Sequence, residues 1–290
     1  MIGGAVAIAA VTRLLSVSSK YNSSIPLLSW QRRWAKSLVS FAMPPLFLLM
    51  TAVAVLVMGP SSCHEWEGQL SYRIAQGFVL MAGLVWLQLS WTAFSAQRAA
   101  RQHPQTTIQT GFGSVVSHVM DSSVPFSAQV GCWSPVLVIS KGLAHRLDSE
   151  HLDAVLAHEK GHDYYRDTFW FFWLGGLRRL TFWLPASEYL WQELLLLREI
   201  RADEWATQRV DSLVLAESLV SVVSTPLKFS DAVAAGFSCP TAPSRLAQRI
   251  DALLAEKAAD EVTHHFFGEG LHWLSLALTL TPLLTIPFHH

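Results

Sequence analysis

The chain has 290 residues, of which 51% are hydrophobic and only 15% are charged, and it includes twelve Trp and fifteen Phe. Because soluble domains carry about a quarter charged residues, this composition argues against an ordinary soluble enzyme and indicates that much of the surface faces lipid. The formal net charge of −1 excludes a polybasic or polyacidic chain. Three widely separated cysteines, Cys63, Cys132 and Cys239, exclude a disulfide scaffold.

Membrane-spanning helices are predicted first, because each needs about 20 predominantly apolar residues. Four segments approach this length: 1–19, 37–59, 74–96 and 271–290. The first three form a predicted membrane domain over residues 1–96. The first segment carries Arg13, which would have to snorkel, and its alternative interpretation is a secretory signal peptide. The last segment contains two prolines, which membrane helices tolerate.

Charge predicts the orientation of these spans. Five basic residues and no acidic residue precede Glu65, so the positive-inside rule places the segment between the first two spans in the cytosol. The loop at about Pro60–Arg73 is then external, and residues 97–270 form a cytosolic domain that begins with Arg98 and Arg101. The prediction is a mainly α-helical, multi-pass cell-membrane protein with about four transmembrane helices and a small β element.

The cytosolic domain is expected to begin with a strand and a capped helix. Ser134–Ser140 alternates apolar residues as a strand does. Asp148 can cap a helix that runs from Ser149 to about Arg166.

Three further helices are expected in this domain. Thr168–Pro185 is rich in aromatic residues and predicts a helix that is buried or lies on the membrane surface. Gln192–Val210 is rich in Leu, Arg and Glu and reads as helical. Near the end of the domain, apolar residues at helical spacing indicate one packed face: Leu246, Ile250, Leu253 and Leu254.

A zinc-binding motif lies on the helix that Asp148 caps. His158, Glu159 and His162 form H-E-x-x-H, in which the spacing of four places both imidazoles on one helix face, where they can bind one Zn²⁺ ion. Glu159 is rotated by about 100° from His158. It can therefore reach the water molecule that such an ion activates, and act as general base.

A second acidic pair can complete this site. A catalytic zinc ion keeps three protein ligands and an open position. Glu199 and Asp203 lie one helical turn apart, so Glu199 can be the third ligand and Asp203 can accept a hydrogen bond from one histidine. Glu193 and Glu204 are the alternatives for the third ligand, and acidic pairs at this spacing are also common on exposed helices.

Other candidate residues are assigned more ordinary roles. His151 is expected to be an exposed residue at the start of its helix, and the pairs His264–His265 and His289–His290 are expected to be solvated. Three residues are candidates for stabilising an oxyanion, and the sequence does not choose among them: Tyr164, Tyr165 and Arg245.

The segments LAHEKGHDYYRD and LLLREIRADEWA resemble those of the beta-lactam sensor-transducer peptidases, the BlaR/MecR antirepressor family. The prenyl-protein and heat-shock membrane proteases share the same pattern of H-E-x-x-H followed by E-x-x-x-D. The resemblance extends upstream through Pro125–Gly131 and Ser134–Ser140, and downstream through Arg245–Leu254.

The resemblance implies a gluzincin-type zinc-peptidase domain with His158, His162 and Glu199 as ligands and Glu159 as general base. It also implies that the strand Ser134–Ser140 offers a backbone edge to an extended substrate. One departure concerns sensing. The family carries an extracellular penicillin-binding domain, whereas this sequence contains no S-x-x-K acylation motif.

The expected function is therefore zinc-dependent endopeptidase activity at the membrane on a cytosolic regulatory protein such as a transcriptional repressor. The expected partners are the lipid bilayer and that substrate, without direct nucleic-acid binding, and homo-oligomers are compatible with the sequence. One alternative is a protease for quality control of membrane proteins or for prenylated proteins. Another alternative is a non-catalytic signalling scaffold that has kept the fold.

Overall fold

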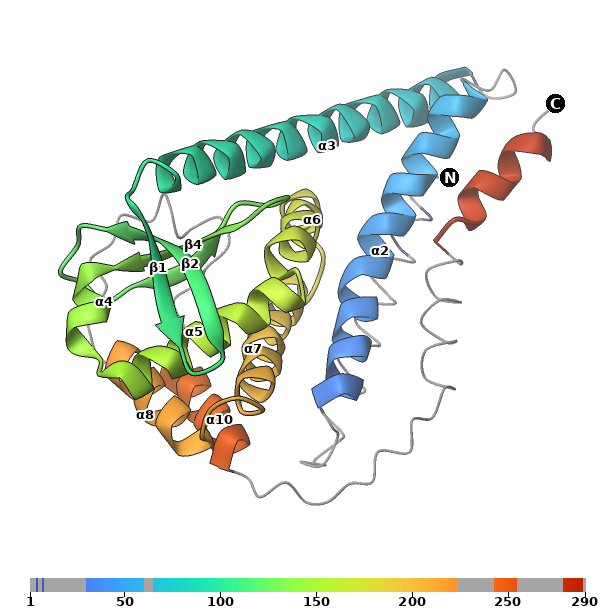
Figure 1. Cartoon of the computed structure of the whole chain (residues 1–290). Helices are drawn as coiled ribbons and strands as arrows, with labels where there is room; N and C mark the ends of the chain where they lie inside the picture. The colour runs from blue at the N-terminus through green and yellow to red at the C-terminus, as the bar shows by residue number, and fades with distance from the viewer. Residues whose placement is uncertain are drawn as a thin grey trace. The chain divides into compact units, whose positions relative to one another are not determined.

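The computed structural model of the chain describes residues 4, 7, 30–59, 65–223, 243–254 and 279–288. The described part is mainly helical and contains one four-stranded sheet (Figure 1). The chain divides into two compact units, with boundaries after Gln88, Trp173, Leu194 and Asp260. The first unit includes the described residues up to Gln88, Leu174–Leu194 and the C-terminal segment, and the second unit holds the rest.

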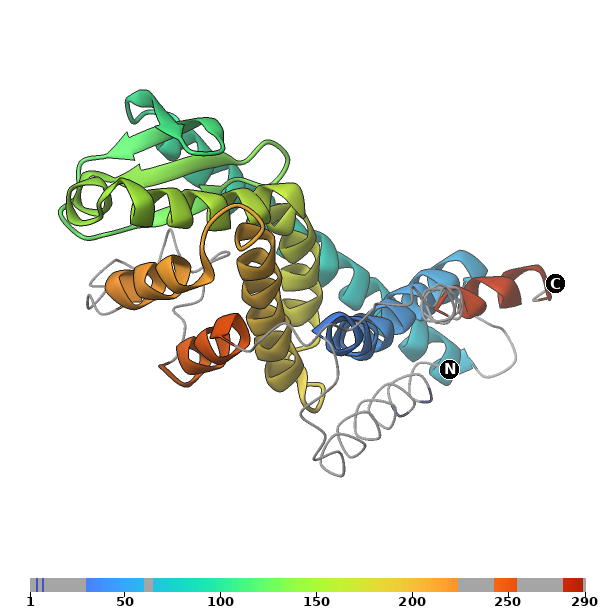
Figure 2. The ribbon, with the colours of Figure 1, turned by 60° about the horizontal axis from the view of Figure 1, so that its bottom comes forward.

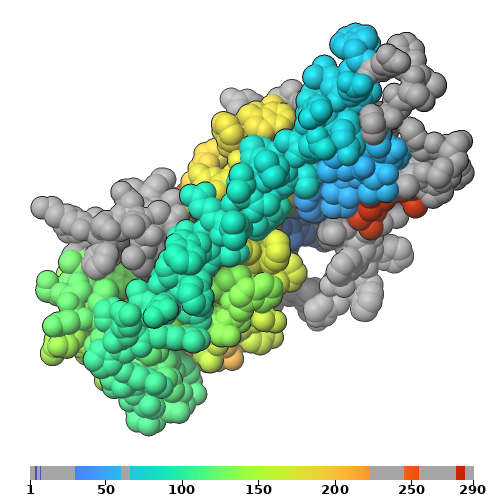
Figure 3. Space-filling model, turned by 90° about the horizontal axis from the view of Figure 1, so that it is seen from above, coloured from blue at the N-terminus to red at the C-terminus, as the bar shows by residue number. Residues whose placement is uncertain are grey.

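Two helices in the described residues are long and apolar enough to cross a membrane. These are α2 (Trp30–Met58) and α3 (Glu65–Ala100). In α3 the candidate membrane span covers Trp66–Ala100. α2 contains two consecutive prolines, which is tolerated in membrane helices. Much of α3 is apolar and open at the surface, with Leu80 68% and Trp91 72% exposed (Figure 3). An apolar surface of this kind is expected where a helix faces lipid.

The expectation of a loop over Pro60–Arg73 is wrong from Glu65 onward, because α3 begins at that residue. The prediction began the helix only at residue 74, after the charged residues Glu65, Glu67 and Arg73. A helix of 36 residues rises about 54 Å, which exceeds the roughly 30 Å of a hydrocarbon core. The first turns of α3 can therefore carry charge and still be helical.

Two predicted spans fall largely outside the described residues. Residues 1–19 are described only at positions 4 and 7, and residues 271–278 of the C-terminal span are not described. The C-terminal span contains η1 (Thr281–Phe288), a 3-10 helix of eight residues that lies against α2. Cys63, Cys239 and the two paired-histidine segments also lie outside the described residues.

The sheet of the second unit consists of β1 (Gln105–Thr110), β2 (Gly113–Met120), β3 (Ser127–Val130) and β4 (Val136–Ser140). Its order is β1-β2-β4-β3, with β4 parallel to β2 and antiparallel to β3. The strand expected at Ser134–Ser140 is thus present as β4. The expectation that it offers a free edge is wrong, because β4 pairs on both sides. The edge beside it is β3.

Helix α5 (Ser149–Tyr164) lies between the sheet and the helix α8 (Ser212–Val223) (Figure 2). Its start is capped as the sequence predicts, because Oδ1 of Asp148 accepts a hydrogen bond of 2.9 Å from the backbone N–H of His151. One face of α5 packs on the sheet in a core that includes Leu137, Ile139, Val155 and Leu156. Its other face packs in a second core that includes Ala154, Ala157, Ala206 and Leu215.

The remaining helices follow the predicted order with shifted ends. The aromatic segment forms α6 (Asp167–Leu180), which continues through its glycine and arginine pairs. The Leu-rich segment forms α7 (Ser187–Ala206), which begins five residues earlier than expected. Two more helices are α4 (Lys141–Arg146) and α10 (Pro243–Leu254).

Helices α5 and α7 approach each other closely at Gly161. A Cβ atom added there would lie 3.1 Å from the carbonyl oxygen of Ala202. The lack of a side chain at Gly161 thus lets the histidine-bearing turns of α5 lie beside the acidic turns of α7.

Candidate metal centre

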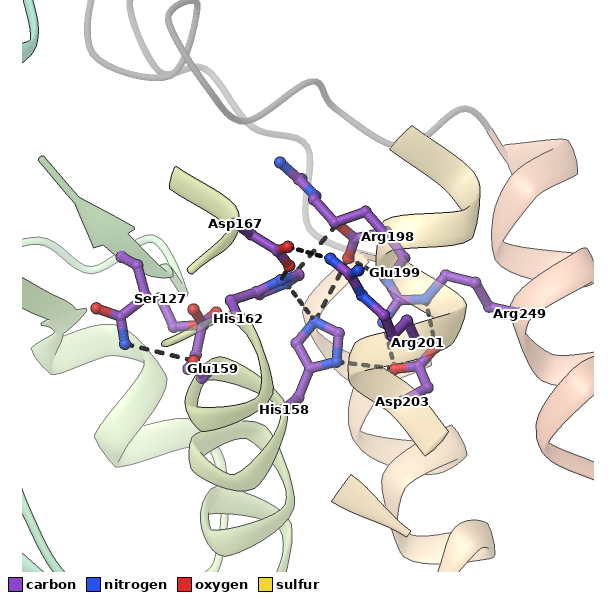
Figure 4. A network of polar contacts seen from close by, with 11 residues as sticks. Ser127, His158, Glu159, His162, Asp167, Arg198, Glu199, Arg201, Asp203 and Arg249 are labelled. Atoms are coloured by element: carbon purple, nitrogen blue, oxygen red, sulfur yellow. Dashed lines mark hydrogen bonds and ion pairs between the residues drawn. The ribbon is translucent and has the colours of Figure 1, made fainter. Parts of the chain in front are cut away.

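The two histidines of α5 lie one turn apart, with their Nε2 atoms 3.1 Å from each other (Figure 4). The other ring nitrogen of each histidine faces an aspartate. Nδ1 of His158 lies 2.8 Å from Oδ1 of Asp203. Nδ1 of His162 lies 2.7 Å from Oδ2 of Asp167. Because a carboxylate favours a proton on the nitrogen that it faces, the Nε2 atoms are left to act as lone-pair donors.

Glu199 of α7 completes the group. Its carboxylate oxygens lie 3.4 Å from Nε2 of His158 and 3.7 Å from Nε2 of His162. Burial raises the pKa of Glu199, but the charges of Arg198 and His162, a hydrogen bond with His158 and the charge of Arg249 together lower it well below its usual value. Glu199 is therefore a carboxylate, which is the form that binds metal.

Asp203 is held between a histidine and an arginine. Arg249 of α10 donates two hydrogen bonds to it, from Nε to Oδ2 at 2.8 Å and from Nη2 to Oδ1 at 2.7 Å. Its third nitrogen, Nη1, lies 3.2 Å from Oε2 of Glu199. Burial raises the pKa of Asp203, but the charges of Arg249 and His158 outweigh this effect and lower it. Arg249 thus fixes both acidic groups of α7 from a separate helix.

Asp167, the first residue of α6, lies between His162 and an arginine, as Asp203 lies between His158 and Arg249. Its side chain is only 2% exposed and contacts the guanidinium of Arg201 as well as His162. The guanidinium of Arg201 in turn lies 4.2 Å from the ring centre of Tyr165. Both histidines are therefore oriented by a buried aspartate, and each aspartate is neutralised by an arginine.

Glu159 is turned away from the two histidines, towards the sheet. Its Oε1 atom accepts a hydrogen bond of 2.8 Å from the hydroxyl of Ser127, the first residue of β3. Its backbone carbonyl accepts a hydrogen bond of 3.4 Å from the side-chain amide of Gln129. The carboxylate therefore lies between the histidine pair and the edge strand (Figure 4).

The chemistry of the donor set fits a divalent metal ion. The coordinating atoms of His158, His162 and Glu199 all lie within 4.8 Å of one another. Two imidazole lone pairs and a carboxylate are all acceptors, so they repel one another unless a cation or a proton lies among them. Without a metal ion, a proton takes this role. Burial lowers the pKa of His158. The charge of Asp203, together with the hydrogen bonds that His158 makes with Asp203 and Glu199, outweighs this effect and raises the pKa to about 9.

The ligand type narrows the choice of metal. Two histidines and one carboxylate from two helices are a ligand set that catalytic zinc uses, and they leave a further position open for water or substrate. Carboxylates behind the histidines are the usual partners of zinc-bound imidazoles. The three residues therefore fit a divalent ion such as zinc.

The structure brings together four of the five residues assigned to the site from the sequence, His158, His162, Glu199 and Asp203, whereas the carboxylate of the fifth, Glu159, contacts Ser127. Among the described residues, the group of ligand atoms contains neither Glu193 nor Glu204. Glu193 instead pairs with Arg33 of α2, with Nη2 2.9 Å from Oε1.

The other candidate histidine and tyrosines have surface or packing roles. His151 lies 2.8 Å from Asp148 and 3.3 Å from Glu217, in a polar network at the surface. Tyr164 is 66% exposed, and the Tyr165 ring is covered by an arginine. Arg245 lies on α10, one turn before the arginine that enters the site.

Sequence reasoning missed Asp167, Arg201 and Arg249. A signal for Arg249 was present, because it shares the apolar face of α10 with Leu246 and Ile250, and a charged residue on such a face needs a buried partner. No comparable pattern marked Asp167, which follows its histidine by five residues across a turn.

Comparison of the chain with known protein families, with curated proteins and with solved structures gives no match. The functional assignment consequently rests on the arrangement of these side chains.

Proposed function

We propose that this chain is a membrane-bound zinc metalloendopeptidase that hydrolyses peptide bonds in a protein substrate. One observation carries the proposal. Two oriented histidines and a buried carboxylate converge on one point, while a second carboxylate on the same helix, Glu159, faces the edge strand of the sheet and contacts Ser127. A structural zinc site would need a fourth ligand and would have no use for this second carboxylate.

The chain's own residues have distinct tasks in such a reaction. A bound zinc ion would polarise the scissile carbonyl and lower the pKa of the attacking water towards about 7. Glu159 accepts the proton of that water as the oxygen attacks the carbonyl carbon, and then passes it to the departing amine nitrogen. The hydroxyl of Ser127 donates a hydrogen bond to Oε1 of Glu159 and so fixes the position of this side chain, while its other oxygen is left to carry the proton from the first transfer to the second. Asp203 and Asp167 keep the imidazoles in the tautomer that binds metal.

The edge strand β3 supplies a place for an extended peptide. Its pairing partner β4 occupies one side only, so the other backbone edge can add a substrate strand. Because β3 begins at the residue that holds Glu159, a peptide on this edge would pass close to the general base. This arrangement replaces the earlier expectation that β4 receives the substrate.

The resemblance to the antirepressor peptidases extends the proposal to a substrate class. A cytosolic regulatory protein, such as a transcriptional repressor, is the substrate that this resemblance suggests, with the catalytic unit on the cytosolic side of the cell membrane. The two candidate spanning helices support a membrane location. No direct contact with nucleic acid is part of the proposal.

The substitution Glu159→Gln tests the catalytic step. It keeps the size of the side chain and leaves the three ligands in place, so bound zinc should stay at one ion per chain. Peptide cleavage should fall by about 10²–10⁴-fold, the usual contribution of a general base. Glu150→Gln, at an exposed position of the same helix, is the matched control and should retain full activity.

Two results would count against the proposal. Full cleavage activity in Glu159→Gln would remove this residue from the mechanism. Zinc binding without cleavage of any protein by the unsubstituted chain would favour the alternative of a signalling scaffold. Comparison of the proteomes of cells that express either form would identify substrates directly.

A further inference from the structure

Three exposed tryptophans and a half-buried phenylalanine form a patch on the second unit, which we call the aromatic patch. Its members are Trp133, Phe169, Trp170 and Trp173. The ring centre of Phe169 lies 5.1 Å from that of Trp133 and 5.3 Å from that of Trp170. Trp133 is 65% exposed and Trp170 is 56% exposed. Contiguous apolar surface of this kind marks a contact with another protein or with a membrane.

The patch joins two elements that are close in space but not in sequence. Trp133 lies in the turn between β3 and β4, and the other three residues lie in the first turns of α6. The turn is also fixed against the C-terminal end of α3. The side-chain amide of Gln97 donates a hydrogen bond to the carbonyl of Ser134. A Cβ atom added to Gly131, which has a φ of +112°, would lie 2.8 Å from Cδ of Gln97.

The end of α3 is where this helix changes from apolar to charged. Residues 74–97 contain no charged side chain, and two of the last apolar ones, Trp91 and Phe94, are strongly exposed. Arg98 and Arg101 follow directly. If α3 crosses the bilayer, this change marks the level at which it leaves the hydrocarbon core, because arginine side chains seek the headgroups.

Gln97 holds the turn that carries Trp133, so this end of the aromatic patch lies beside the residue that precedes Arg98. Its composition suits that position, because Trp is enriched at the membrane–water interface, where the ring is apolar and the indole N–H is polar. The guanidinium of Arg166 lies 5.4 Å from the ring centre of Phe169, and so places a positive charge beside the patch. A positive charge here would face the phosphates of the lipid headgroups.

We propose that the aromatic patch lies in the headgroup region of the bilayer that α3 crosses, and that it seats the second unit on the membrane surface. The proposal depends on α3 as a membrane span and not on peptidase activity. Its failure and the failure of the proposed function can therefore be told apart.

A spin label beside the patch tests this placement in the full chain. The three cysteines are replaced (Cys63→Ser, Cys132→Ala and Cys239→Ser), and one new cysteine is introduced by Ser134→Cys, which keeps Trp133. Ser149→Cys, at an exposed position at the start of α5, is the control. Each protein is labelled with a nitroxide and reconstituted into vesicles of phosphatidylcholine and phosphatidylglycerol. Collision rates are measured with oxygen, which concentrates in lipid, and with a water-soluble nickel complex.

The ratio of oxygen to nickel collisions should be severalfold higher at position 134 than at position 149. Equal ratios at the two positions would overturn the proposal, because the patch would then face water. Low collision rates with both reagents at position 134 would also overturn it, because a protein surface would then cover the patch.

A second pair of variants removes the cause. Trp133→Asp combined with Trp170→Asp should lower the ratio at position 134 to that of the control, because carboxylates are expelled from the interface. Trp133→Phe combined with Trp170→Phe should retain most of the difference. An unchanged ratio in the Asp variant would show that these rings do not hold the unit on the membrane. If the Asp variant loses its bound zinc or its helical signal, the comparison of positions 134 and 149 still decides.

Discussion

Replacing Arg249 of α10 with Met should destabilise the protein strongly. The guanidinium is 4% exposed and makes three contacts of 2.7–3.2 Å to Asp203 and Glu199. Met retains much of the aliphatic length but leaves both carboxylates buried without their common partner. Breaking a buried ion pair by removing one side costs about 3–5 kcal/mol.

This loss can be measured by thermal unfolding of the purified, zinc-loaded chain in detergent. A change of 1 kcal/mol shifts Tm by about 2–4 °C in a chain of this size class, so the expected decrease is about 6–20 °C. Gln248→Met is the matched control, because Gln248 is the exposed neighbour on the same helix. Its effect should stay within about 0.5 kcal/mol.

A double-mutant cycle separates the ion pair from a general loss of packing. Asp203→Leu alone leaves the guanidinium partly unpaired, whereas Asp203→Leu with Arg249→Met removes both charges. The double variant should be less destabilised than the sum of the single variants, by about 0.5–3 kcal/mol. If Arg249→Met has the same Tm as the Gln248→Met control, or if the effects of the two single variants simply add, Arg249 and Asp203 do not form a stabilising ion pair.

Three further results are expected. Asp167→Asn should weaken zinc binding by about 10–100-fold, because it removes the carboxylate that orients His162; binding unchanged in a zinc titration would contradict this role. Since the pKa of His158 is raised to about 9, a proton must leave before metal binds, and zinc affinity should rise about tenfold per pH unit up to that pH. A pH-independent affinity between pH 6 and about 8 would exclude this competition. Gly142→Ala should destabilise the protein by about 1–3 kcal/mol, because the new Cβ would lie 2.2 Å from the carbonyl oxygen of Ser123; an unchanged Tm would refute it.

The sequence was most informative where local rules decide the structure. The cap at Asp148 and the helix that follows it depend on contacts between residues three positions apart, and the structure has both. The interior strand β4 was also found, because alternation of apolar residues is local. Its neighbours were not, because the order of strands in a sheet is set by long-range pairing that alternation does not encode.

The candidate site was predictable to the extent that its residues share a helix. His158 with His162, and Glu199 with Asp203, each follow from a spacing of four. Arg249 reaches the same point from a helix that is separated by more than 40 residues in sequence, so no spacing rule could place it. The strands β1 and β2, which form the first hairpin of the sheet, were also missed. Most of β1 is exposed and shows no strong apolar pattern.

The tight crossing of α5 and α7 defines a sequence signature with which relatives of this chain can be sought. A Cβ atom added at Gly161 would lie only 3.1 Å from the carbonyl oxygen of Ala202. A bulky residue at either position would therefore force the histidine-bearing turn of α5 and the acidic turn of α7 apart. Genomes can be scanned for H-E-x-small-H followed by E-x-x-small-D, a stricter signature than the zinc motif alone. Sequences with a large residue at either small position must build their centre on a different crossing.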